Sequence, residues 1–157
     1  MTHTAFLKSP LGITKIVGDV NGISEISISD EGEVSVSIPK ELEQAVIQLQ
    51  EYFDGKRNEF NFKLNPKGTE FQQRVWQELL NIPFGKTLSY LELSKKLGDV
   101  KAIRAVAAAN GKNPLWIVVP CHRVIGTDGS LTGYAGGLGR KKWLLEHENP
   151  TNQQSLF

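Results

Sequence analysis

The chain has 157 residues, of which 39% are hydrophobic and 22% charged, a composition that indicates a globular protein with one core or two small domains. No apolar run approaches the roughly 20 residues of a membrane span, and the N-terminus lacks the basic-then-apolar pattern of a signal peptide. The net charge of +1 conceals an asymmetry, because residues 1–66 contain 6 Lys and Arg against 10 Asp and Glu, whereas residues 67–157 contain 12 against 7. The basic second half suggests contact with a polyanion; a solvated basic face is the alternative.

The first 66 residues predict antiparallel strands followed by one helix, together forming a supporting domain. β-branched residues with alternating polarity mark strands over 13–20, 22–29 and 33–38, and Asn21-Gly22 is typical of a hairpin turn. Pro39 suits the first turn of a helix over 40–53. Residues 58–67 form either a last strand or an extended linker pinned by aromatic side chains. No chemical constellation occurs in this part of the chain.

Residues 67–148 predict a mainly helical domain, so that the fold class is α+β. Thr69 is a good N-cap for a helix that ends near Ile82-Pro83. Residues 87–111 fit a helix-turn-helix, in which Ser89 caps a first helix to Leu97 and Gly98-Asp99 makes the turn. The second helix of the pair is predicted over 100–110.

That second helix is unusually rich in alanine. It presents a single arginine, Arg104, whereas helices that read the major groove usually carry several long polar side chains. A thin face including Ala102 and Ala105 suits the narrower minor groove, with Arg104 inserted where a base has left the stack. The alternative is that the alanines serve helix propensity and close packing, with Arg104 in a salt bridge.

The only cysteine of the chain follows a run of β-branched residues. Residues 117–119 predict a buried strand that Pro120 breaks, which would hold Cys121 at the strand's end with His122 pointing to the opposite face. A free thiol is only about 3% ionised at pH 7, and a histidine acting through water would raise that fraction. The alternative is a small buried hydrophobic residue. The three histidines and one cysteine form no cluster at metal-ligand spacing, so no metal is predicted.

Three segments around Cys121 carry a family resemblance. Asn113-Pro114, Pro120-Cys121-His122-Arg123-Val124 and Gly133-Tyr134-Ala135-Gly136-Gly137 resemble the O6-alkylguanine-DNA alkyltransferases, closely over residues 68–148 and loosely from residue 9. The resemblance implies a ribonuclease H-like N-terminal domain and a helix-turn-helix that binds the minor groove of double-stranded DNA. It also implies single-turnover transfer of an alkyl group from O6 of an extruded guanine to Cys121, with O4-alkylthymine as a further candidate substrate. No cofactor is expected, since a thiolate is already a strong nucleophile.

The resemblance also assigns roles residue by residue. His122 would take the thiol proton through water, Glu148 would orient His122, and Tyr90 would rotate the nucleotide and protonate the departing guanine. Arg104 would be the arginine finger. Around the pocket, Asn113 would brace the active-site turn and Tyr134 would be the aromatic side chain of the covering loop. The backbone N–H groups of Val124 and Ala135 would donate to O6. Each has a structural alternative, such as a turn-forming Asn before proline or a solvated carboxylate near a helix end.

One departure from the family pattern is Trp116, which stands where a small residue or proline is more usual. Its ring would either narrow the pocket or add a stacking wall. Two other functional classes are considered. A non-catalytic lesion-binding relative would have tryptophan in place of the cysteine, and a cysteine hydrolase would turn over on esters or amides.

The tail over residues 149–157 is polar and is predicted to be disordered. Its last five residues, Gln153–Phe157, resemble the Gln-x-x-Leu-Phe peptides that bind bacterial sliding clamps, although such short patterns also occur by chance. One cysteine excludes an intrachain disulfide and favours a reducing compartment. We therefore expect a cytoplasmic monomer that does not associate with membranes.

Overall fold

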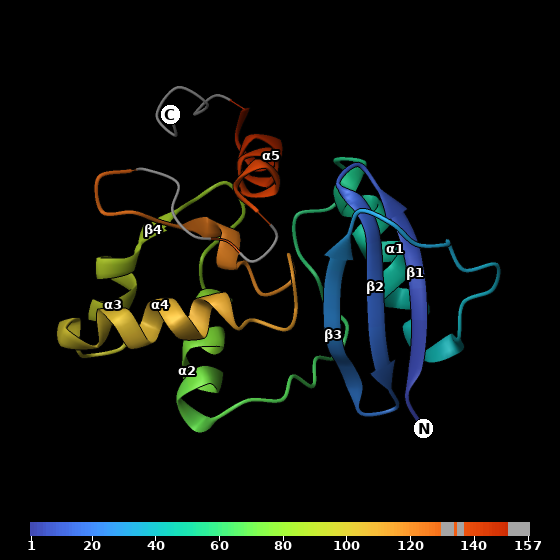
Figure 1. Ribbon diagram of the computed structural model, residues 1–157, viewed down its shortest axis with the longest axis horizontal. Helices are drawn as coiled ribbons and strands as arrows, with labels where there is room; N and C mark the ends of the chain where they lie inside the picture. Colours follow the sequence, from blue (N-terminus) through green and yellow to red (C-terminus); the bar gives the residue numbers. More distant parts are fainter. Residues whose placement is uncertain (130–133, 135–136, 151–157) are drawn as a thin grey trace. The chain divides into compact units, whose positions relative to one another are not determined.

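The computed structural model describes residues 1–129, 134 and 137–150, and it divides the chain into two compact units (Figure 1). The first unit contains Met1–Lys67 and the short segment Pro114–Trp116, and the second contains Gly68–Asn113 and the chain from Ile117 onward. The first unit holds an antiparallel sheet and the second is mainly helical, so the α+β class is confirmed. Among the described residues, no helix is both long and apolar enough to cross a bilayer.

The sheet of the first unit is built from three consecutive antiparallel strands. They are β1 (His3–Ser9), β2 (Gly12–Asp19) and β3 (Gly22–Ser29), in the order β1-β2-β3. Asp19 pairs with Gly22, so the hairpin predicted around Asn21-Gly22 is confirmed. Alternate side chains point to one buried face, as expected of a sheet that is wet on the other side, and they include Ala5, Leu7, Ile16 and Ile26.

One helix packs on this sheet. A 3-10 turn (η1, Lys40–Leu42) leads into α1 (Glu43–Phe53), which confirms the helix predicted after Pro39. Pro39 has φ −56°, a value that its ring imposes and that suits a helix start. In Figure 1, α1 lies behind the sheet, and its apolar stripe of Ala45, Leu49 and Tyr52 is buried.

The strand predicted over residues 33–38 is wrong, because these residues form no strand in the structure. The third strand of the sheet is instead β1, which precedes the two that were correctly predicted. Ser35 crosses the edge of β1, where its N–H donates to the carbonyl of Phe6 at 3.0 Å and its hydroxyl accepts from the N–H of Phe6 at 2.8 Å. A side-chain hydroxyl thus replaces a backbone partner at this edge, and the neighbouring Val34 and Val36 remain exposed.

Residues 58–67 are an extended linker with one strand-like contact. The N–H of Ile23 donates to the carbonyl of Lys63 at 2.9 Å, and the N–H of Asn65 donates to the carbonyl of Ile23 at 2.7 Å. The ring of Phe60 lies 5.6 Å from that of Tyr52, measured between centroids. The linker alternative, pinned by aromatic side chains, therefore describes this segment.

Pro114–Trp116 is a second segment that pairs with β3. The N–H of Ile26 donates to the carbonyl of Pro114 at 2.8 Å, and the N–H of Trp116 donates to the carbonyl of Ile26 at 3.0 Å. The Trp116 ring is buried, 6.4 Å from the ring of Phe53. Three residues just ahead of the cysteine stretch therefore belong to the sheet unit, although they lie far from it in the sequence.

Within its described residues, the second unit contains four α-helices. Capping boxes start the first two at Thr69 and Ser89, whose hydroxyls accept from backbone N–H groups three residues further on. A 3-10 turn (η2, Val100–Ala102) precedes the third, and the indole N–H of Trp76 donates to the carbonyl of Ala109 at 2.9 Å, which ties the first helix to the third. The helices are α2 (Glu70–Leu79), α3 (Tyr90–Lys96), α4 (Ile103–Gly111) and α5 (Leu138–Glu148). α3 and α4 are the two helices of the predicted helix-turn-helix.

Candidate active site

Cys121 is delivered by sharp turns rather than by a strand. The strand predicted over residues 117–119 is wrong, because Ile117 has φ +72°, a left-handed value that is rare for a β-branched residue and incompatible with an extended chain. Pro120 then adopts φ −82° and ψ 65°, an inverse γ-turn in which the N–H of Cys121 donates to the carbonyl of Val119 at 2.8 Å. Cys121–Arg123 continue as a 3-10 turn, η3.

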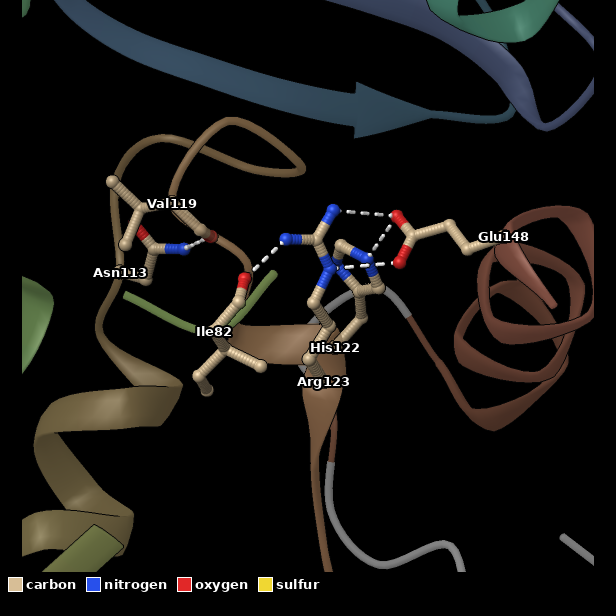
Figure 2. Close-up of polar contacts among 6 residues, drawn as sticks. All are labelled: Ile82, Asn113, Val119, His122, Arg123 and Glu148. Atoms are coloured by element: carbon tan, nitrogen blue, oxygen red, sulfur yellow. Dashed lines mark hydrogen bonds and ion pairs between the residues drawn. The ribbon is translucent and has the colours of Figure 1, made fainter. Parts of the chain in front are cut away.

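Asn113 braces this turn from the end of α4. Its side-chain Nδ2 donates to the carbonyl of Val119 at 2.7 Å (Figure 2). The same side chain hydrogen-bonds the thiol of Cys121. The Asn113 amide therefore satisfies the Val119 carbonyl, which in a sheet would accept from a neighbouring strand. The same amide also lies close to the Cys121 sulfur.

A short parallel strand pair brings α3 to the cysteine turn. β4 (Leu88–Ser89) pairs with β5 (Val124–Ile125), with Ser89 opposite Ile125. Because Ser89 is also the N-cap of α3, Tyr90 is held as the first residue of the helix, beside the segment that leaves η3. The N–H of Val124 donates to the carbonyl of Cys121 within η3. In this structure that N–H is engaged within the turn, and its donation to O6 stays a prediction.

His122, Arg123 and Glu148 form a buried polar cluster (Figure 2). Nε2 of His122 lies 2.7 Å from Oε2 of Glu148. Arg123 reaches the same carboxylate with two nitrogens, Nε to Oε1 at 2.7 Å and the second terminal nitrogen to Oε2 at 3.0 Å, and its first terminal nitrogen donates to the carbonyl of Ile82 at 2.6 Å. Arginine thus links the end of α5 to the turn that follows α2.

The Glu148 carboxylate determines which ring nitrogen of His122 carries a hydrogen in the bonded cluster. Burial alone would raise the pKa of Glu148, but the charge and hydrogen bond of His122 and those of Arg123 outweigh it and hold that pKa well below its usual range. An ionised Glu148 can only accept, so Nε2 of His122 carries a hydrogen, and in the neutral ring Nδ1 is the nitrogen that can take up a proton. Nδ1 is buried and makes no hydrogen bond to any residue that the structure describes. His122 is therefore poised to accept a proton at Nδ1.

Cys121 is buried, and Asn113, Lys141 and Tyr134 are close enough to act on its thiol. Burial raises the pKa of its thiol, whereas the Asn113 side chain, the charge of Lys141 and the nearby Tyr134 side chain act in the opposite direction. Nζ of Lys141 lies 5.9 Å from the ring centroid of Tyr90 and 5.9 Å from that of Tyr134. The structure thus brings together Cys121, Asn113, Tyr90 and Tyr134, all of which the sequence singled out.

The residues predicted to contact DNA lie on α4 and on the η2 turn that precedes it. Arg104 and Ala105 are exposed and Ala102 is partly exposed, whereas Val106 and Ala109 on the opposite face are buried. None of the ion pairs among residues 1–129, 134 and 137–150 involves Arg104. The exposed face of α4 therefore carries small side chains and one long basic side chain, Arg104. Close packing accounts only for the alanine on the opposite, buried face.

Two predicted features lie outside the described residues, namely Ala135 and the tail segment Gln153–Phe157. Within the described part of the chain, no group of three or more His, Cys, Asp or Glu side chains could hold a metal ion. Trp116 packs on Phe53 within the sheet unit, and the two pocket roles considered for it stay predictions.

Sequence reasoning missed two site residues, Arg123 and Lys141. Arg123 was quoted only as part of a motif, and nothing in its spacing indicates that it shares a carboxylate with His122. Lys141 had a detectable signal, because it precedes Leu144, Leu145 and Glu148 by three, four and seven residues and so shares their helix face. A lysine on a buried face is unusual enough to attract attention.

Each of the two units matches a domain of a known protein family. The 6-O-methylguanine DNA methyltransferase ribonuclease-like domain matches residues 2–66, and the DNA binding domain of the same family matches residues 70–150. A methylated-DNA–protein-cysteine methyltransferase of Methanosarcina acetivorans is 43% identical in an alignment of 153 residues that covers 93% of this chain and 97% of that protein. One of Mycobacterium bovis is 44% identical and covers 94% of this chain and 93% of its own length.

Solved structures agree with these sequence matches. The crystal structure of Mycobacterium tuberculosis O6-methylguanine methyltransferase superposes with a TM-score of 0.85 at 42% identity, covering 96% of this chain and 94% of that one. A second structure of the mycobacterial protein, in complex with DNA, has the same TM-score and covers 98% and 94% of the two chains. By motif, by matching sequence and by fold, this chain belongs to the methylated-DNA–protein-cysteine methyltransferase family.

Proposed function

We propose that this chain repairs DNA by direct reversal, moving a methyl or other alkyl group from O6 of guanine onto Sγ of Cys121. The observation that carries the proposal is a single buried cysteine followed by a histidine whose Nε2 is held by an ionised carboxylate. The names of the related proteins, which are cysteine methyltransferases acting on methylated DNA, support the same reaction. O4 of thymine is a second acceptable donor in this proposal.

The reaction is a displacement at carbon. The thiol proton of Cys121 passes through a bridging water to Nδ1 of His122, and the thiolate attacks the alkyl carbon. The carbon–sulfur bond forms as the bond to O6 breaks, and guanine leaves with the bonding electrons. Tyr90 gives its phenolic proton to N3 of the departing base, and the proton held by His122 returns through solvent to the phenolate. A thioether has no route back to a thiol, so each molecule acts once.

Glu148 and Arg123 support the base in this scheme. The carboxylate holds the His122 ring in one tautomer and stabilises the imidazolium that forms when the thiol ionises. Arg123 keeps Glu148 ionised inside the protein, because its guanidinium compensates the buried negative charge. Asn113 holds the turn that carries the sulfur, and Tyr134 lies beside the thiol.

Because O6 of guanine is buried in the base stack, the nucleotide must leave the duplex before reaction. α4 offers the surface for this step, with Ala102 and Ala105 allowing its backbone close to the floor of the minor groove. Arg104 would occupy the space that the extruded base leaves. The small side chains favour contacts to the DNA backbone and groove shape over reading of base edges.

Replacing Arg104 by alanine is expected to slow repair of duplex DNA by about tenfold to a hundredfold, the cost of losing a stacked guanidinium. The rate with free O6-benzylguanine should change little, because that substrate needs no extrusion. Both rates can be followed by intact-protein mass spectrometry. Lys112→Ala, which removes another exposed charge at the end of the same helix, is the matched control. Equal losses on both substrates would contradict the finger role of Arg104.

The proposed reaction is tested by mixing the protein with a duplex that contains one O6-methylguanine. We expect the intact mass to rise by one methyl group, the gain to map to the peptide containing Cys121, and the yield to stop at one methyl per protein. A duplex with ordinary guanine is the control. Tight binding without a mass gain would show a lesion-binding protein instead, and turnover on esters would show a hydrolase.

We also propose that the chain acts as a monomer in the cytoplasm and that Gln153–Phe157 bind the replication sliding clamp. The support for clamp binding is the pattern of the last five residues alone. Pull-down with a bacterial sliding clamp should recover the full chain and fail with a chain that ends at residue 152. Equal recovery of both chains would overturn this partner.

A further inference from the structure

Lys141 is a fully buried lysine on α5 that the reaction scheme above does not use. It shares one helix face with the buried Leu144, Leu145 and Glu148. Placing an ammonium group in the interior is costly unless nearby groups compensate its charge. An apolar residue would fill the same position at lower cost, so the charge itself calls for an explanation.

The surroundings of Lys141 are the residues of the transfer site. Its Nζ lies 5.9 Å from the ring centroids of both Tyr90 and Tyr134, from α3 and from the loop ahead of α5. Both distances are within cation–π range, so the two rings hold the ammonium between them. Cys121 of η3 is near enough that its sulfur and the ammonium of Lys141 interact electrostatically.

The other charged groups of η3 are already engaged. His122 and Arg123 both bind Glu148, which leaves the thiol as the group on η3 that responds to the charge of Lys141. Two further titratable groups near the ammonium, among the residues that the structure describes, are the phenols of Tyr90 and Tyr134.

We propose that Lys141 is a further residue of the transfer site, whose buried ammonium offsets the cost of forming the Cys121 thiolate. The proposal rests on the proposed function above. In the step concerned, the thiol proton goes to His122 while the sulfur becomes negative, and Lys141 keeps its own proton. Because the charge is held in a poorly solvated site, it acts on the sulfur more strongly than a surface lysine would.

Two opposite effects of burial make this assignment testable. Burial raises the pKa of the Cys121 thiol, and it lowers the pKa of Lys141 to about 8, against the opposing charge of Cys121. Raising the pH toward 8 therefore favours the thiolate while Lys141 is still charged. Above pH 8 Lys141 loses its proton and its support for the thiolate disappears. The rate should rise with pH up to about 8 and then level off.

The experiment measures alkylation of Cys121 between pH 6 and 10 in the full chain, with O6-benzylguanine and, separately, with iodoacetamide as the alkylating agent. We expect Lys141→Met to react at least about tenfold more slowly at pH 7, since one unit of thiol pKa changes the thiolate fraction tenfold. Its rate should also keep rising beyond pH 8, because the group that titrates there is gone. Lys141→Arg keeps a permanent charge, so it should restore the rate and likewise lose the break near pH 8.

Lys142→Met is the matched control, because it removes the neighbouring, exposed lysine of the same helix. Its pH profile should equal that of the unaltered protein. A profile for Lys141→Met that retains the break near pH 8 and the full rate would overturn the role of Lys141. Iodoacetamide separates this outcome from failure of the proposed function, because it reports thiolate formation even in a protein that does not react with alkylated guanine.

Discussion

Replacing Cys121 by alanine is expected to abolish methyl transfer completely while leaving the protein folded and able to bind DNA. Sγ is the atom that forms the new bond, and the chain contains no second thiol. Cys121→Ser should be equally inactive, because a hydroxyl ionises far less readily than a thiol. With a duplex containing O6-methylguanine, neither variant should gain mass after prolonged incubation.

Because the substitution is small, a loss of activity in Cys121→Ala can be separated from a loss of folding. Cys121 is 6% exposed, and removing one sulfur leaves only a small cavity, for which we expect a loss of about 1–2 kcal/mol in the free energy of unfolding. The Asn113 amide still has the Val119 carbonyl as its partner, so the turn should persist. Binding of the variant to the damaged duplex, measured by fluorescence anisotropy, is the control for folding. A mass gain by Cys121→Ala would mean that another side chain is the acceptor.

Replacing Glu148 by glutamine is expected to lower the free energy of unfolding by about 3–5 kcal/mol, the usual cost of breaking a buried ion pair by removing one partner. Glutamine has nearly the same shape, but it leaves Arg123 as an uncompensated buried cation and lets the His122 ring change its tautomer. We expect the transfer rate to fall about a hundredfold as well, in the range of losses for a supporting residue of this kind. Urea unfolding and the intact-mass assay measure the two effects.

The same substitution should change the response of stability to acid. The folded-state pKa of Glu148 is held well below its usual range, whereas in the unfolded chain it returns to about 4.3. The stabilisation is therefore complete above about pH 5 and is lost as the pH falls toward the lowered folded-state pKa, because the unfolded state takes up the proton first. The unaltered protein should lose stability steeply between pH 5 and 3, and Glu148→Gln less so.

Glu146→Gln is the matched control for both measurements. It removes the same charge from the same helix at a partly exposed position. Surface charges of this kind contribute about 0–1 kcal/mol, so both its stability at pH 7 and its acid response should stay close to those of the unaltered protein. Similar losses in Glu146→Gln and Glu148→Gln would contradict the importance assigned to the buried cluster.

Local signals predicted most of the elements correctly. Thr69 and Ser89 were recognised as N-caps because all the residues of a capping box lie within four consecutive positions. The hairpin at Asn21-Gly22 was recognised because the residues that favour its turn are equally close in sequence. The two wrong strands, over 33–38 and 117–119, have β-branched or alternating residues but lack a partner strand. Strand propensity is satisfied only by pairing, and pairing depends on residues far away in the chain.

The stretch around Cys121 shows where this limit matters. The residues of the turn read as a strand, yet Ile117 is left-handed, and the carbonyl of Val119 is bound by a side chain rather than by a ladder. The preceding segment, Pro114–Trp116, is held by Ile26 of β3, almost ninety positions earlier. The residue spacing around Cys121 does not indicate that this segment pairs with β3.

Residue types alone determined that a lone cysteine stands next to a histidine in a basic, helix-rich half of the chain, because composition, capping and turn chemistry are short-range. The tertiary structure decided that Arg123 shares Glu148 with His122 and that Lys141 lies buried beside the sulfur. Burial and charge compensation between α5 and η3 arise only when segments distant in sequence meet in a poorly solvated interior, where each charge depends on its neighbours.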